Sequence, residues 1–431
     1  MSATHSLLVH SARQIVQVVS DGTLVKCGSA MKSVDILQDT NGTGYSILVD
    51  RSGNIADIGT DAEVRARNPD LEADTVMDAT GKCIIPGLVD AHTHPVWAGD
   101  RVHEFAMKLA GATYMDVHKA GGGIHFTVEH TRNASADELF SSFKSRLEFM
   151  RRAGTTLVEC KSGYGLDLNT EMKMLKVIER GRDLDIGISS TYCGAHAVPK
   201  NKTSEEATAD ILTKQIPELE RLMADQALHV DNIDVFCERG VFDVQQTRRI
   251  LEAGKTLGLN INFHGDELHP TGSAEMGADI GALAISHLEE ISDAGIVAMA
   301  TSGSVGVVLP TTAYILRLRP PPVRKMLEQS MAIALGSDFN PNAYCMAMPM
   351  VMHLACVILH MSMPEALNAA TINAAHALGV SQKQGSLEVG KLGNMVVLNT
   401  DKWENLIYKF GCYNEVIDYV VYKGKIVHTR Q

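Results

Sequence analysis

The sequence predicts an α/β protein: a (β/α)8 TIM-like barrel with a small β-sandwich domain built from both termini. The middle of the chain alternates strand-like apolar runs with helix-like stretches, which is typical of βα units. Segments rich in β-branched and aromatic residues flank this middle on both sides. We therefore expect the sandwich to comprise residues 1–82 plus 380–431, and the barrel to comprise residues 83–379.

The expected sandwich strands are short apolar runs bounded by Gly, Asn or Asp. They are residues 6–10, 15–19 and 45–49 near the start, and 394–398 and 419–427 near the end. Because β-rich segments at both ends of the chain flank a middle in which strands alternate with helices, we expect one sheet domain that both termini complete.

The expected barrel strands number eight, as a closed parallel barrel requires. They are residues 83–89, 155–161, 187–193, 232–237, 259–264, 281–287, 304–309 and 331–337, and helical stretches such as 136–153, 170–182, 204–224 and 244–258 separate most of them. In the first strand, Ile84, Ile85, Leu88 and Val89 form the buried run, and Pro86-Gly87 adds a kink.

Polar residues collect where these strands stop, as expected for an active site at the carboxyl ends of barrel strands. In chain order they are His92 and His94, Glu159-Cys160-Lys161, His196, Glu238, His264, His287, Thr311-Thr312, and Asp338 with Asn340. A doubly wound sheet would also alternate strands and helices. It would not explain so many ionisable residues at successive strand ends.

Four of these residues form a candidate metal site. His92 and His94 are one residue apart after a buried strand, so their rings point the same way, and neutral imidazole is a common metal ligand. His264 ends the fifth strand, and Asp338 follows an apolar strand where a buried charge needs a partner or a metal. The competing interpretations are a hydrogen-bonded core histidine for His264 and a helix N-cap for Asp338.

Three histidines and one aspartate leave a coordination position for water, which is typical of a catalytic site. A metal-bound water has a pKa near ~7 and can supply hydroxide at neutral pH. Asp338 could take the proton of that water and deliver it to a leaving nitrogen. His287 could orient the water or stabilise the charge that develops on it.

The chain resembles the amidohydrolase superfamily in its mononuclear branch, through G-L-V-D-A-H-T-H at 87–94, His264, His287, S-D at 337–338 and G-S-L-E-V-G-K-L-G-N at 385–394. Within it, the sequence resembles the imidazolonepropionase family, the ring-opening hydrolases of histidine degradation. The motifs of that resemblance are W-A-G-D-R at 97–101, G-G-G-I at 121–124, E-C-K-S-G-Y-G-L at 159–166, G-A-H-A-V-P at 194–199, H-G-D-E at 264–267 and D-F-N-P at 338–341. They span nearly the whole chain in order.

The resemblance implies roles for five further residues. Arg101 matches the residue that grips the substrate's propionate, for which a guanidinium is suited. Tyr164 and Asn340 match other substrate contacts, and His196 matches the group near the ring carbonyl. Glu267 matches a catalytic carboxylate that hydrogen-bonds the ring.

Two departures leave questions open. Asn342-Ala343-Tyr344 follows Pro341, where bacterial members carry a small Gly-Ser pair, so the donors on this loop are in doubt.

Lys161 and Glu238 raise a two-metal alternative, because related enzymes bridge two metals with a carboxylated Lys or a Glu. We expect one ion, Zn or Fe, since three His and one Asp accept either. We interpret Gly121-Gly122-Gly123 as an active-site loop.

The implied reaction opens the cyclic amide of 4-imidazolone-5-propanoate to N-formimidoyl-L-glutamate with a metal-activated water. The main alternative is an amidohydrolase-type deaminase of a nucleobase-like ring, and a non-enzymatic scaffold is disfavoured because all four candidate ligands are present. A homodimer is suggested only by the family.

Bulk composition limits the partners and the compartment. A net charge of −12 argues against nucleic acid, which binds clustered Lys and Arg. No apolar run approaches the ~20 residues of a membrane span, and residues 1–14 lack the pattern of a signal peptide. The eight cysteines are scattered without a C-x-x-C pair, so we expect reduced thiols and a cytoplasmic location.

Overall fold

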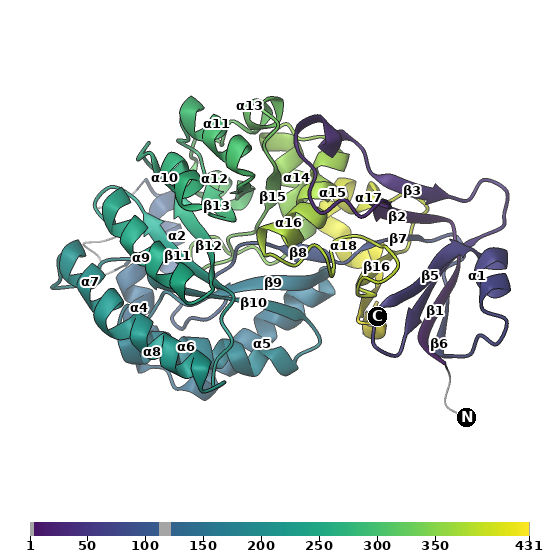
Figure 1. The fold of residues 1–431 in the computed structure, drawn as a ribbon, viewed down its shortest axis with the longest axis horizontal. Helices are drawn as coiled ribbons and strands as arrows, with labels where there is room; N and C mark the ends of the chain where they lie inside the picture. Colours follow the sequence, from purple (N-terminus) through teal and green to yellow (C-terminus); the bar gives the residue numbers. More distant parts are fainter. Residues whose placement is uncertain (1–3, 112–121, 431) are drawn as a thin grey trace.

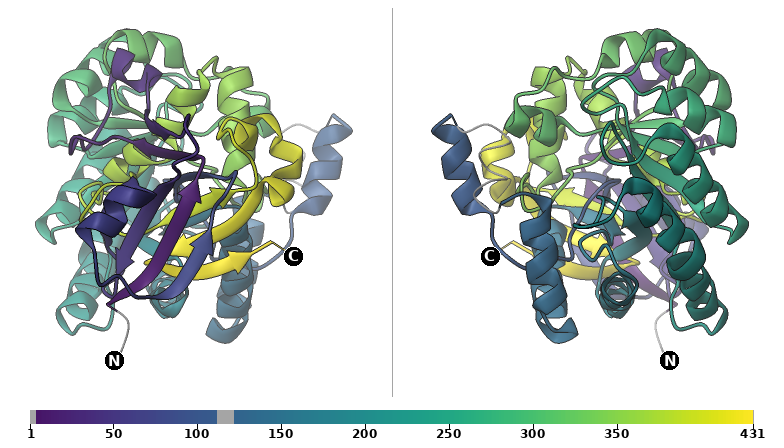
Figure 2. Two further views of the ribbon diagram at one scale, coloured as in Figure 1. Left: turned by 90° about the vertical axis from the view of Figure 1, so that its right-hand side faces the viewer. Right: turned by 90° about the vertical axis from the view of Figure 1, so that its left-hand side faces the viewer.

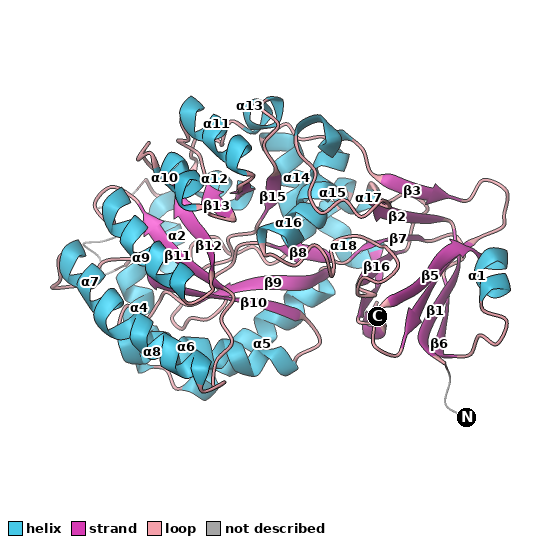
Figure 3. Ribbon diagram, in the orientation of Figure 1, coloured by secondary structure: helices cyan, strands magenta, loops and turns pink. Residues whose placement is uncertain are grey.

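The computed structural model describes residues 4–111 and 122–430 of the 431-residue chain. Its strands form a barrel surrounded by helices and, to one side, two smaller sheets (Figures 1 and 3). The predicted class, an α/β barrel with a sandwich from both termini, is confirmed. Gly121 of the expected glycine loop lies outside the described residues.

The barrel consists of eight parallel strands in consecutive order. They are β8 (Leu88–Asp90), β9 (Thr155–Lys161), β10 (Gly187–Ala195), β11 (Asn232–Cys237), β12 (Asn260–Gly265), β13 (Ala284–His287), β14 (Val305–Val308) and β15 (Ile333–Leu335). Backbone contacts between the segments that follow β8 and β15 close the ring. The Asp338 N–H donates to the His92 carbonyl (2.9 Å), and the His94 N–H donates to the Phe339 carbonyl (2.8 Å).

Most of the helices pack on the barrel. The described α-helices are α1 (Asp61–Arg67), α2 (Val102–Leu109), α4 (Ile124–Asn133), α5 (Ala136–Arg152), α6 (Leu168–Arg180), α7 (Ser204–Asp210), α8 (Ile216–Ala224), α9 (Val244–Thr256), α10 (Ser273–Ile280), α11 (Asp293–Ser302), α12 (Pro310–Leu316), α13 (Val323–Glu328), α14 (Met348–Ile358), α15 (Met363–Ala369), α16 (Ile372–Ala377), α17 (Asn405–Tyr408) and α18 (Tyr413–Val416). The helix expected over 204–224 is interrupted by a π-helical segment, Ile211–Gln215. Among the described helices, none has the length and apolar character needed to cross a membrane.

The sandwich joins strands from both ends of the chain, which lie side by side in Figure 2. One sheet has the order β5 (Ile55–Thr60), β4 (Tyr45–Asp50), β1 (His5–Ala12), β6 (Ala73–Asp78). The other has the order β18 (Lys425–Thr429), β17 (Ile417–Tyr422), β16 (Met395–Leu398), β7 (Cys83–Pro86), β2 (Gln14–Val18), β3 (Asp35–Gln38). The strand expected over 419–427 is the hairpin β17–β18, which turns at Lys423 and Gly424, both with positive φ.

The single strand expected over residues 83–89 is wrong, because it is two strands in different sheets. β7 pairs with β16 and β2 in the six-stranded sheet, and β8 pairs with β9 in the barrel. The chain changes sheet at Pro86-Gly87, and an added Cβ on Gly87 would lie 2.1 Å from the Thr156 hydroxyl. The apolar run is continuous because both strands are buried on both faces.

The six-stranded sheet contributes to two hydrophobic cores. Ile84 belongs to the sandwich core, whereas its neighbour Ile85 packs with the main barrel core. Val397 and Val396 of the adjacent strand divide in the same way. Alternation along a strand therefore joins the two parts of the molecule through one sheet.

Candidate metal centre

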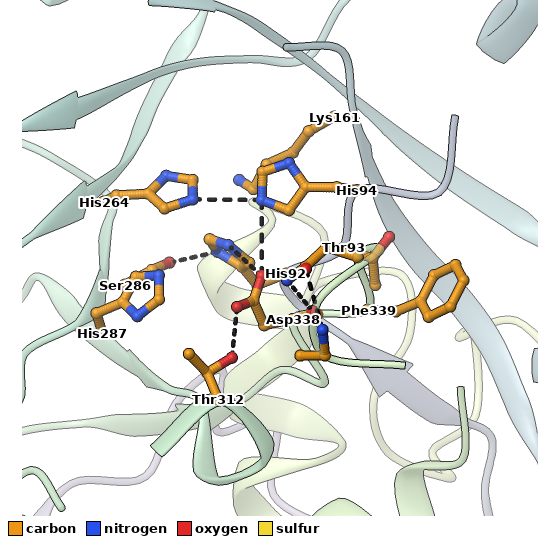
Figure 4. Close-up of polar contacts among 12 residues, drawn as sticks. His92, Thr93, His94, Lys161, His264, Ser286, His287, Thr312, Asp338 and Phe339 are labelled. Atoms are coloured by element: carbon orange, nitrogen blue, oxygen red, sulfur yellow. Dashed lines mark hydrogen bonds and ion pairs between the residues drawn. The ribbon is translucent and has the colours of Figure 1, made fainter. Parts of the chain in front are cut away.

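The structure brings the four predicted ligands together at the carboxyl ends of the barrel strands (Figure 4). The Nε2 atoms of His92 and His94 lie 3.5 and 3.6 Å from Oδ1 of Asp338. His264 Nε2 lies 3.3 Å from His94 Nε2. All four side chains are buried.

In His92 and His264, the ring nitrogen Nδ1 already has a polar partner. Nδ1 of His92 lies 2.8 Å from the Ser286 hydroxyl, and Nδ1 of His264 lies 2.8 Å from Oδ1 of Asp234. A carboxylate behind a histidine fixes its tautomer and orients the opposite nitrogen, as it does in many metal sites.

One ring nitrogen that faces the other proposed ligands has no hydrogen-bond partner among the residues that the structure describes. His92 Nε2 is buried without a hydrogen-bond partner in the described part of the chain. Burial and neighbouring positive charge lower the pKa of His92 and His94 well below the usual value, so both rings are neutral and have a lone pair for a cation. These residues fit a divalent metal ion.

Lys161 lies behind the centre and is engaged in an ion network. Its Nζ lies 2.6 Å from both Glu159 Oε1 and Asp234 Oδ2. Although burial acts in the opposite direction, these carboxylates hold the pKa of Lys161 above its usual value. A charged, paired ammonium is not available for carboxylation. The other residue of the two-metal alternative, Glu238, accepts hydrogen bonds from the Leu268 N–H (2.9 Å) and pairs with His269 (2.9 Å).

Asp338 lies just after β15 in a left-handed backbone conformation. Its Oδ2 accepts a hydrogen bond from the Thr312 hydroxyl (2.5 Å), which leaves Oδ1 facing the histidines. Its φ of 48° is in the left-handed region that non-glycine residues seldom occupy. Backbone strain of this kind is concentrated at functional sites. Burial raises the pKa of the Asp338 carboxyl.

His287 and Glu267 lie at the edge of the group formed by the four proposed ligands. The His287 ring stacks on His264 with centroids 5.1 Å apart, and its Nε2 lies 3.6 Å from Glu267 Oε2. Burial and nearby carboxylates raise the pKa of Glu267 well above its usual value. Glu267 and His287 therefore form a buried pair of titratable groups beside the proposed ligands.

His196 and Tyr164 lie next to His94. The His196 ring is stacked on His94, with centroids 4.5 Å apart and an interplanar angle of 11°. Nδ1 of His196 lies 3.0 Å from the Gly163 carbonyl, so it donates there and turns its other nitrogen away from that loop. Burial lowers the pKa of His196 to about 3, which keeps the ring neutral. The ring centroids of Tyr164 and His196 lie 5.2 Å apart.

Arg101 and Asn340 both bond to residues close to them in the sequence. Arg101 Nη2 lies 2.7 Å from Oε2 of the buried Glu104, whose Oε1 accepts the Gly123 N–H (2.7 Å). Asn340 Nδ2 donates to the Asp338 carbonyl, and its Oδ1 accepts the backbone N–H of Asn342 (2.7 Å). In this structure Asn340 shapes the loop that departs from the bacterial pattern.

Sequence reasoning missed the residues that orient the centre. They are Asp234, Ser286 and Glu104. Thr312, which bonds Asp338, is among the polar residues expected at the strand ends. A signal existed for Asp234, because an aspartate within an apolar strand needs a partner. Ser286 is a small hydroxyl residue of a kind common in any strand, and nothing local distinguishes it.

Comparison with known proteins places the chain in a family. The model of the amidohydrolase family matches residues 83–427. A human protein named probable imidazolonepropionase is 60% identical over 429 residues, covering 99% of this chain and 100% of that protein. A relative of the same name from Danio rerio is 61% identical, with 99% and 98% covered, and one from Dictyostelium discoideum is 51% identical, with 100% and 99% covered.

Solved structures share the fold at low sequence identity. A guanine deaminase from C. acetobutylicum with bound guanine has a TM-score of 0.72 at 15% identity, covering 98% of this chain and 99% of that one. An adenosine deaminase from Xanthomonas campestris with bound zinc has a TM-score of 0.71 at 18% identity, covering 100% and 94%. The chain belongs to the amidohydrolase family, in the group whose curated members are named probable imidazolonepropionase.

Proposed function

We propose that this enzyme hydrolyses 4-imidazolone-5-propanoate to N-formimidoyl-L-glutamate. The observation that carries the proposal is the convergence of three buried imidazoles and Asp338 in a chain about 60% identical, over its full length, to relatives named for that activity. A cyclic amide is a substrate that such a centre can attack without a covalent enzyme intermediate.

The reaction adds one water across the ring amide. The water oxygen bonds to the carbonyl carbon, the carbon–nitrogen bond breaks, and a proton of the water moves to the departing nitrogen. Both ring nitrogens stay in the product, one as the glutamate nitrogen and the other in the formimidoyl group that this nitrogen carries, so no ammonia is released.

The proposed ligands are His92, His94, His264 and Asp338, and they would hold one zinc or iron ion. Such an ion, when bound, acidifies water and polarises a carbonyl oxygen. In this proposal the carboxylate of Asp338 takes the proton of the attacking water and returns it to the ring nitrogen. Thr312 holds the carboxylate in position for both transfers through its hydrogen bond to Oδ2.

Substrate orientation is assigned to the groups around this centre. We propose that Arg101 binds the propionate, with Tyr164 and Asn340 as further contacts. His196 would contact the ring carbonyl, and the Glu267–His287 pair would bond the ring and exchange protons with it. The Arg101–Glu104 ion pair supports the first assignment because it fixes the guanidinium before substrate arrives.

All eight cysteines lie in described residues and are free, which supports our proposal of a reducing, cytoplasmic location.

The decisive experiment separates ring opening from deamination. Metal-loaded protein incubated with fresh 4-imidazolone-5-propanoate should remove the substrate's ultraviolet band and yield formimidoyl-glutamate by mass spectrometry, without ammonia. His264→Ala prepared in parallel is the control, and it should lose both metal and turnover. Stoichiometric ammonia from a nucleobase-like ring, with imidazolone propanoate untouched, would overturn the proposal and leave the family assignment intact.

A further inference from the structure

Glu289 is a buried carboxyl group whose burial the fold does not explain. Its side chain is only 4% exposed. Neither of its oxygens has a hydrogen-bond partner from another residue in the described ranges 4–111 and 122–430. An unpartnered carboxyl group is unfavourable in the interior of a protein, so a purely structural role does not account for it.

The nearest polar atom opposite Glu289 belongs to His287. Glu289 Oε2 lies 3.7 Å from His287 Nδ1, and that nitrogen is itself buried without a hydrogen-bond partner among the described residues. On its other side, His287 Nε2 faces Glu267. The imidazole therefore lies between two buried carboxyl groups, with Glu267 on the substrate side and Glu289 behind.

The backbone between the two residues is built to bring Glu289 back to the ring. His287 has a φ of 77° and Leu288 a φ of 71°, two consecutive non-glycine residues in the left-handed region. Two hydrogen bonds hold this turn against the end of β12, from the Leu288 N–H to the Gly265 carbonyl (3.1 Å) and from the Glu290 N–H to the Asp266 carbonyl (2.8 Å). Strain in a fixed turn is typical of segments that position functional groups.

We propose that Glu289 is a positioning residue that acts through His287. This inference rests on the proposed function, in which His287 exchanges protons beside the metal ligands. Whether ionised or protonated, a carboxyl group at Nδ1 bonds that nitrogen and leaves Nε2 to exchange protons with water or substrate. At 3.7 Å the two atoms are just beyond hydrogen-bond distance, and catalytic hydrogen bonds often shorten to full contact only when substrate binds.

The consequence for the reaction is a fixed tautomer and a fixed orientation of the His287 ring. A carboxyl group at Nδ1 keeps Nε2 directed toward Glu267 and the substrate side. A carboxylate behind a catalytic histidine does this in the serine protease triad, where its loss costs about 10⁴ in kcat.

The test compares Glu289→Gln with Glu289→Asp and, as a matched control, Glu290→Gln. Glu290 is the adjacent residue of the same type and is half-buried. Each holoenzyme is assayed for metal content, thermal unfolding, kcat and KM. In addition, ¹⁵N spectra of histidine-labelled protein, recorded without substrate, report which nitrogen of His287 carries the proton, with the signals assigned from a His287→Gln sample.

We expect Glu289→Gln to keep its metal and its unfolding temperature, to lose about a hundredfold or more in kcat with little change in KM, and to shift the His287 nitrogen signals. Glu289→Asp should recover part of kcat, and Glu290→Gln should match the wild type. Unchanged His287 signals with normal kcat would overturn the proposal, as would loss of metal or a lower unfolding temperature in step with kcat, because either indicates a structural role. If Glu289→Gln does not fold, the His287 nitrogen signals of Glu289→Asp take its place. A shift of these signals supports the proposal, and unchanged signals with normal kcat overturn it. The substrate-free spectra stand even if imidazolone propanoate is not the substrate.

Discussion

At the scale of single residues, the metal centre depends on side chains one layer behind its proposed ligands. Asp234 illustrates this, because it bonds both the ring nitrogen and the backbone N–H of His264 and also pairs with Lys161. The attraction of His264 and Lys161 holds the pKa of the Asp234 carboxyl below its usual value despite burial. This carboxylate is therefore ionised at any physiological pH.

We predict that Asp234→Asn weakens metal binding about 10–100-fold, because an amide orients and polarises His264 less strongly than a carboxylate. Competition with a chelator, followed by elemental analysis, measures the change. Asp231→Asn is the control: Asp231 precedes the same strand and bonds Ser190 and Arg182, away from the centre. Equal metal affinity in the two variants would show that Asp234 does not support the site.

A second residue-scale prediction concerns Arg101. Arg101→Met removes a charge-assisted contact worth about 1.5–3 kcal/mol, so kcat/KM for imidazolone propanoate should fall about tenfold or more. Arg101→Lys should recover only part, because an ammonium lacks the planar fork. A ring analogue without the carboxylate is the control substrate. If that analogue suffers the same loss, Arg101 does not bind the propionate.

The residues that sequence patterns identified are those whose chemistry is unusual where they stand. Histidines and an aspartate after apolar strands are conspicuous, and the structure brings His92, His94, His264 and Asp338 together. Glu104 and Glu289 escaped, because a glutamate in a helix or after a strand usually lies in solvent. Only the tertiary structure shows that these two are buried, and their roles stay predictions until tested.

At the scale of elements, the approach of β8 to β15 sets the position of His92. A Cβ added to Gly336 would lie 2.7 Å from the His92 Cβ and 2.9 Å from its backbone nitrogen. No side chain fits there without moving the ligand. The requirement is one of space, since the two strand ends must nearly touch to close the barrel.

Gly336→Ala should therefore lower the free energy of unfolding by about 1–3 kcal/mol and reduce the metal content of the purified protein. Chemical denaturation and elemental analysis give the two quantities. Gly411→Ala is the matched control, because a Cβ there meets nothing within 4 Å. Full metal occupancy in Gly336→Ala would mean that the closure tolerates the displacement.

The ends of an element were predictable where the pattern of apolar residues changes along the sequence. They were not predictable where one apolar run continues from one element into the next. The strand expected over residues 155–161 matches β9. The run over 83–89 concealed a change of sheet, because both strands are fully buried and carry the same apolar residues. Burial on both faces removes the alternation that would have separated them.

At the scale of the whole molecule, the six-stranded sheet joins the sandwich to the barrel. Ile84 and Ile85 are both fully buried, yet they lie in different cores. The sequence predicted both parts of the molecule. It did not predict that one sheet serves both, and the division at residues 82/83 and 379/380 remains a prediction.

We expect Ile84→Ala and Ile85→Ala each to cost about 2–5 kcal/mol in unfolding free energy. Because they sit on opposite faces of one sheet, both should lower a single calorimetric transition. Ile36→Ala is the control: Ile36 is 38% exposed and should change stability by less than about 0.5 kcal/mol. Two separate transitions, with each variant moving only one, would show that the sandwich and the barrel unfold independently.

The pairing of β7 with β16 has a consequence for the order of assembly during synthesis. β7 and the histidines that follow β8 leave the ribosome before most of the barrel. β16, which pairs with β7 in the finished sheet, and β17, which pairs with β16, are translated only after the barrel strands. Until then β7 presents an open edge to other chains. A ribosome that stalls before β16 would release a nascent chain with most of the barrel translated but this edge unprotected. Such fragments should be prime substrates for chaperones and proteases.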